Sequence, residues 1–155
     1  MADQPAFDVS AAHRYFSTHC YNDAFDLIDK RDRSLDDDMR MLHLSMASLW
    51  HWSQRQDCTS TNLSIGYWQV ARIYALLGQI DNARRYGQRC LEVSQTEGVE
   101  PFYMGFAYEA LARAEAVAGD TLKRDGYLRE AYAITERITS EEEKQMLVND
   151  LRTIG

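Results

Sequence analysis

Proline and cysteine are scarce in this chain. Its 155 residues include only two prolines, Pro5 and Pro101, and three cysteines. Because proline interrupts helices, its scarcity leaves nearly the whole chain free to be helical. The cysteines Cys20, Cys58 and Cys90 are odd in number and far apart, and no C-x-x-C pair occurs. They are therefore expected to be free thiols, and no disulfide framework is predicted.

Basic charge and long apolar runs are also lacking. The formal net charge is −7, whereas nucleic acids and anionic membranes require a basic face on their partner. No apolar stretch is long enough to cross a bilayer, and the N-terminal residues do not resemble a signal peptide. We therefore expect a cytoplasmic protein that binds neither nucleic acid nor membrane.

Motifs that carry chemistry are absent as well. The four histidines, His13, His19, His43 and His51, lack the close spacing to Cys, Asp or Glu that metal-ligand sets show, and no H-E-x-x-H occurs. No glycine-rich phosphate loop and no arrangement of a nucleophile with a base is found. The sequence predicts no metal, no cofactor and no enzymatic activity.

Helical periodicity, in contrast, runs through the whole chain. Leu35, Met39, Leu42, Met46 and Leu49 step by four and three residues, the spacing of an amphipathic helix. Similar stripes recur between cap residues and glycines, which mark the helix ends. Short connections make neighbouring helices antiparallel. Eight helices are predicted, at about residues 8–19, 23–31, 35–55, 63–77, 81–97, 101–118, 120–138 and 140–153.

Two of the predicted helix pairs repeat one another. Aligning Gly78 with Gly119 places Val70 over Leu111, Ala71 over Ala112, Arg72 over Arg113, and Cys90 over Ala131. An apolar and then a small residue on the first helix, a glycine in the turn and small residues on the second helix form a recognisable pattern. It resembles the tetratricopeptide repeat, with the best repeats at about 61–97 and 101–138.

This resemblance implies the architecture of the chain. It predicts one all-α domain over residues 1–155, a right-handed superhelix of antiparallel helix pairs in which 140–153 is a terminal capping helix. The second repeat departs from the family, because Glu115 stands where an aromatic belongs and Arg124 where an alanine belongs. Gly87 occupies a position at which the family usually has a large side chain, and we expect an aromatic side chain from a neighbouring helix to cover it.

The resemblance also implies a binding surface, since the first helix of each such repeat lines the concave face. One repeat would contribute Ile65, Trp68, Gln69 and Arg72, and the next Phe106, Glu109 and Arg113. Arg72 and Arg113 would then lie about 8–10 Å apart, where an extended acidic peptide or a chain terminus could bind. The clamp of lysines and asparagines with which some members bind peptide C-termini is not reproduced.

A purely structural interpretation of the same residues stays open. Glu109 and Arg113 are four residues apart, the usual spacing of a pair within one helix, and Arg72 could reach the same carboxylate. The leading hypothesis is a module that binds a protein or peptide through Trp68, Gln69, Arg72, Glu109 and Arg113.

Two other functions are considered. The cluster Trp50-His51-Trp52 is expected to pack in the core, but an exposed indole would be an anchor for a partner. A self-associating protein, dimerising through an exposed Trp52 face or the terminal helix, is the first alternative. The second is a small-molecule sensor or enzyme with a pocket near His51, Arg55, Asn62, Gln69 and Arg113.

Overall fold

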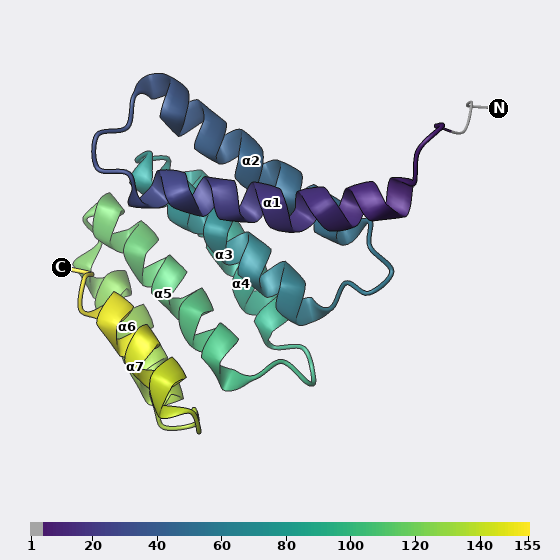
Figure 1. Ribbon diagram of the computed structural model, residues 1–155. Coiled ribbons are helices and arrows are strands. Elements are labelled where there is room, and N and C mark those ends of the chain that lie inside the picture. Colours follow the sequence, from purple (N-terminus) through teal and green to yellow (C-terminus); the bar gives the residue numbers. More distant parts are fainter. Residues whose placement is uncertain (1–4) are drawn as a thin grey trace. The chain divides into compact units, whose positions relative to one another are not determined.

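The computed structural model describes residues 5–155, and the described residues form an all-α structure without strands. Seven helices occur within this range (Figure 1). They are α1 (Val9–Asp29), α2 (Leu35–Ser53), α3 (Ser60–Leu76), α4 (Ile80–Ser94), α5 (Pro101–Ala118), α6 (Thr121–Thr135) and α7 (Glu141–Leu151). The predicted all-α class of packed helix pairs is confirmed, because α1 packs on α2, α3 on α4 and α5 on α6.

The helices form two compact units, residues 1–58 and residues 59–155. The first holds the antiparallel hairpin of α1 and α2. In the second, α5 is central, because it packs against α3, α4, α6 and α7. The prediction that residues 1–155 form a single repeat domain is not decided by this division and stays a prediction.

Local sequence sets most helix ends. The side chains of Ser34 and Thr59 accept the backbone N–H groups of Asp37 and Asn62, and each forms a complete capping box at the start of α2 and α3. At Gly119, α5 ends in the left-handed region, with φ 75°. Glycine tolerates this conformation because it lacks a Cβ.

The predicted break between residues 19 and 23 is wrong. Helix α1 continues from Val9 to Asp29, so residues 5–155 contain seven helices where eight were expected. The segment Cys20–Asp23 contains neither glycine nor proline, and polar residues alone do not end a helix whose backbone bonds can continue. The buried face of α2 also differs from the predicted stripe, because Leu35 and Met39 are exposed.

In the second unit, several equivalent positions of the two repeats are equally buried. Ala71 and Ala112 are both buried, as are Cys90 and Ala131. These small side chains let neighbouring helices approach closely. Gly87 is covered by the Leu111 side chain rather than by the predicted aromatic, and a Cβ on Gly87 would lie 2.9 Å from Leu111 Cδ2.

Candidate functional site

The second unit contains a carboxylate that is fully buried, that of Glu109 on α5. Three side chains donate hydrogen bonds to it. Trp68 Nε1 lies 2.8 Å from Oε2, while Arg72 Nη1 and Arg113 Nε lie 3.2 and 2.7 Å from Oε1. A buried charge is tolerated only when it is paired and hydrogen-bonded, and this arrangement meets both conditions.

The register of α3 and α5 brings these groups together. Trp68 and Arg72 are one helical turn apart on α3, and Glu109 and Arg113 are one turn apart on α5. Trp68 and Glu109 are separated by 41 residues, which is also the offset that aligns Gly78 with Gly119. The bond therefore joins equivalent positions of the two repeats, as helices stacked side by side require.

Helix α7 and the residues that follow it lie at the edge of this cluster. Arg113 Nη2 donates to the backbone oxygen of Asp150 at 3.3 Å and to Thr153 Oγ1 at 2.8 Å. Burial, followed by the charge of Glu109, raises the pKa of the Asp150 carboxyl, while Arg72 and Arg113 oppose this rise. Two arginines and two acidic groups balance one another here, so the cluster presents hydrogen-bond donors without a strong positive field.

The five predicted binding residues differ in their access to solvent. The Arg72 and Arg113 side chains are 19% and 14% exposed, and Trp68 is half-buried, with its ring packed edge-on against Phe106. Gln69 and Glu109 lie in the interior. Trp68, Arg72 and Arg113 are therefore the members that a ligand could touch, whereas the buried Glu109 carboxylate orients all three.

A second buried carboxylate, Glu115, also lies on α5. Arg84 of α4 binds it through two parallel contacts of 2.9 and 2.7 Å. Sequence reasoning noted Glu115 only as a departure from the repeat pattern. Its position in a run of alanines on an apolar helix was the available signal, because a charge in such a place needs a partner.

Beside this pair lies an open groove of about 440 Å³. Helices α4 and α6 form its walls, and Leu111 and Glu115 of α5 are also in its lining. The groove is lined by Asp81, Arg84, Arg85, Gln88, Leu111, Glu115, Lys123 and Tyr127. Both acidic and basic side chains line this groove, so its charge does not favour one class of ligand.

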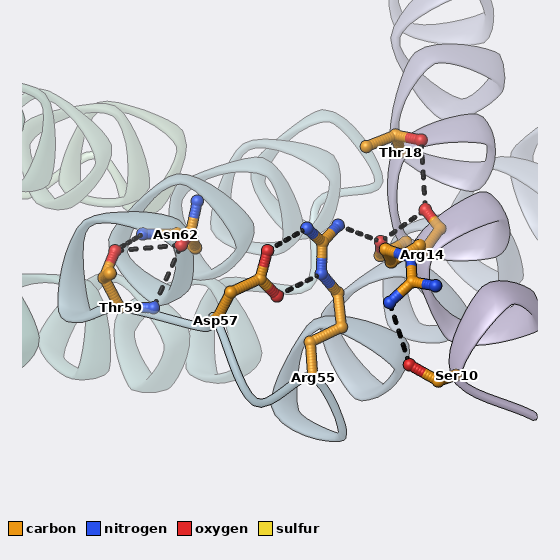
Figure 2. A network of polar contacts seen from close by, with 8 residues as sticks. Ser10, Arg14, Thr18, Arg55, Asp57, Thr59 and Asn62 are labelled. Atoms are coloured by element: carbon orange, nitrogen blue, oxygen red, sulfur yellow. Dashed lines mark hydrogen bonds and ion pairs between the residues drawn. The ribbon is translucent and has the colours of Figure 1, made fainter.

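In the first unit, the Trp50-His51-Trp52 cluster does not pack entirely in the core. Trp50 is 56% exposed, so it is Trp50 rather than Trp52 that could act as an anchor. The guanidinium carbon of Arg55 lies 3.8 Å from the centroid of the Trp52 ring. Arg55 also binds Asp57 at 2.8 and 2.6 Å (Figure 2) and donates to Ser17 Oγ at 2.9 Å. Arg55, which follows α2, is thus hydrogen-bonded to α1 through Ser17.

His51 has a partner that the sequence did not reveal. His13 Nδ1 on α1 lies 2.8 Å from His51 Nδ1 on α2, and both side chains are partly buried. Burial and then the charge of His13 lower the pKa of His51. The residues are 38 positions apart, so no local motif could identify the pair.

The described residues contain neither a metal-ligand cluster nor a helix that could span a membrane. Among residues 5–155, no group of three or more His, Cys, Asp or Glu side chains could hold a metal ion. In the same part of the chain, no helix is long and apolar enough to cross a membrane. His51 and Arg55 belong to the first unit and Gln69 and Arg113 to the second, so the pocket near these residues stays a prediction.

The fold and the Glu109 cluster together define an all-α protein of successively packed helix pairs whose central helix carries buried, paired carboxylates. Comparison with protein-family models, with curated proteins and with solved structures gives no match to this chain.

Proposed function

We propose that this chain is a protein-interaction module that binds an extended, carboxylate-bearing segment of a partner along the α3–α5 face. The observation that supports the proposal is that Arg72 and Arg113, from two successive helix pairs, are held on one buried carboxylate, Glu109. Both guanidinium groups thereby lie side by side. Arginine is suited to binding carboxylates because its planar guanidinium group can donate several hydrogen bonds at once.

Pre-organisation is the physical advantage of this arrangement. A flexible arginine loses side-chain entropy when it binds a ligand, but here Glu109 has already restricted both side chains. Arg113 has five N–H donors, and its described contacts use Nε and Nη2. The half-buried Trp68 ring adds an apolar surface beside the donors.

The balance of charge constrains the kind of partner. Because Glu109 and Asp150 offset the two arginines, long-range attraction of an acidic partner contributes little, and short-range hydrogen bonds to a carboxylate contribute most. We therefore propose a moderate affinity with weak salt dependence. As part of the same proposal, the α3–α4 and α5–α6 pairs are two tetratricopeptide-like repeats of a cytoplasmic protein.

Selection from a random peptide library displayed on phage tests the proposal. Peptides that bind the wild-type chain should be rich in Asp and Glu or should require a free C-terminal carboxylate. An Arg72→Lys/Arg113→Lys double variant keeps the charges around Glu109 but loses the planar donors. Its affinity for the selected peptides should fall by about tenfold, or roughly 1.4 kcal/mol.

Arg84→Lys is the matched control, because Arg84 pairs with a buried carboxylate on the α4 side of α5. This variant should bind the peptides as the wild type does. Peptides without any carboxylate, or equal binding by the double variant, would contradict the proposal.

Self-association is a second candidate, and the exposed apolar surface of the first unit favours it. A single helix pair cannot bury its own apolar face. The exposed large apolar residues in this unit are Phe7, Val9, Tyr15, Phe16, Leu35, Met39 and Trp50. Sedimentation equilibrium should then show a dimer that dissociates in a Phe16→Glu/Trp50→Glu variant, and a monomeric wild type would refute it.

A further inference from the structure

The pair of histidines that joins α1 to α2 has an unusual atomic arrangement. His13 and His51 approach through the same ring atom, with 2.8 Å between the two Nδ1 atoms and 5.0 Å between the ring centroids. When the two neutral rings form this hydrogen bond, one Nδ1 carries a hydrogen and the other accepts it. If both rings instead carry their hydrogen on Nε2, two Nδ1 lone pairs become available at one place.

The distance between these nitrogens is compatible with two neighbouring ligands of one metal ion whose coordination angles are 90°. With metal–nitrogen bonds of about 2.0 Å, two neighbouring ligands at 90° lie about 2.8 Å apart, whereas a tetrahedral angle separates them by about 3.3 Å. The observed separation of 2.8 Å is closer to the first value, and it is also within the ordinary range of a hydrogen bond. To bind an ion, both rings must reorient until their Nδ1 lone pairs point at it instead of at one another.

We propose that His13 and His51 form a two-imidazole site for a divalent cation with tetragonal geometry, with copper(II) preferred. Imidazole nitrogen is a suitable ligand for this ion, and copper(II) stands highest in the affinity order of divalent first-row metals. Water completes the coordination, since the pair supplies two protein ligands. The site joins the two helices of the first unit, and it is independent of the proposed peptide surface.

Aromatic neighbours give the site a spectroscopic reporter. The Trp50 ring lies 5.4 Å from the His13 ring and 4.8 Å from the His51 ring, measured between centroids. The Phe16 ring lies 5.4 Å from that of His51. A paramagnetic ion held between the two histidines should therefore quench the fluorescence of Trp50.

The test is a titration of the full-length chain with copper(II), buffered by glycine and followed by tryptophan fluorescence and electron paramagnetic resonance. We expect one ion per chain, quenched fluorescence and hyperfine splitting from two nitrogens. His13→Gln and His51→Gln should each weaken binding by about 100-fold, because one of two linked ligands is lost. His19→Gln and His43→Gln are matched controls that should bind as the wild type does.

Two further measurements keep the result interpretable if a histidine variant folds poorly. Trp50→Phe leaves both ligands in place, so it should keep the copper affinity measured against a chromogenic chelator while losing much of the quenching. The right-angled bite also predicts that nickel(II) binds more tightly than zinc(II). Equal affinity in the wild type and the His13→Gln variant, unchanged quenching in Trp50→Phe, or preference for zinc(II) over nickel(II) would each overturn the proposal.

Discussion

Replacing Glu109 by glutamine removes the charge at the centre of the α3–α5 contact while keeping the shape of the side chain. Glu109 is fully buried and receives hydrogen bonds from Trp68, Arg72 and Arg113. Removing one partner of a buried ion pair typically costs about 3–5 kcal/mol. The amide oxygen can still accept hydrogen bonds, and both arginines reach solvent in part, so we expect a loss of about 2–3 kcal/mol in the free energy of unfolding.

Urea denaturation followed by far-ultraviolet circular dichroism measures this loss. The substitution lies in the second unit, so the contribution of the first unit to the free energy of unfolding is the same in the variant and the wild type and cancels in their difference. For a unit of roughly 100 residues, 2–3 kcal/mol corresponds to a decrease in Tm of about 10–20 °C.

Glu92→Gln is the matched control, since Glu92 is exposed and pairs with Arg89 one turn away on α4. Its effect should stay within about 0.5 kcal/mol. If Glu109→Gln and Glu92→Gln changed stability equally, the buried carboxylate would not organise the contact as described.

Three smaller predictions concern helix packing and acid stability. Gly126→Ala should stabilise the protein by about 0.5–1 kcal/mol in urea denaturation, because the nearest atom to its new Cβ is a side-chain nitrogen at 3.8 Å. Gly105→Ala should lower the free energy of unfolding by about 1 kcal/mol in the same assay, because its Cβ would lie 2.4 Å from the buried Leu147 Cδ2 and overpacking outweighs the helix preference. The hydrogen bond from Lys30, followed by that from the backbone N–H of Ser34, lowers the pKa of Asp37 from 3.8 to about 2. A carboxyl pKa below its unfolded value stabilises the fold above pH 3.8 and ceases to do so as the pH falls towards 2. Carboxyl-detected nuclear magnetic resonance should give that pKa, and Lys30→Gln should raise it.

The sequence was sufficient to predict the helix pairs of the second unit, because periodic apolar residues and local end signals coincide there. Gly119 ends α5 and Ser140 caps α7, as expected from their types. The prediction of a break in α1 was wrong because no local end signal is present there. Cys20–Asp23 lacks any residue that forces the backbone out of the helix, and only packing against α2 decides that the helix continues.

The candidate site was predictable where it follows from the repeat. Arg72 and Arg113 occupy the same position relative to Gly78 and Gly119, so side-by-side stacking was enough to predict that they are neighbours. Burial of individual members was not predictable, and Gln69 proved to be internal. The contact between His13 and His51 depends on the crossing of α1 and α2, a tertiary property that carries no signal in local spacing.

The two buried carboxylates of α5 occur where the second repeat departs from the first. Glu109 stands at the position equivalent to Trp68, and Glu115 at that of Tyr74. Each carboxylate is matched by an arginine from a neighbouring helix, Glu109 by Arg72 of α3 and Glu115 by Arg84 of α4. A slip of one turn, about 5.4 Å, would separate both carboxylates from these arginines. Glu109 would then keep only Arg113 of its own helix, and Glu115 would lose Arg84. Since buried ion pairs contribute little net stability compared with apolar packing but are costly to break, we infer that these pairs chiefly fix the register of α3, α4 and α5, and with it the adjacency of Arg72 and Arg113.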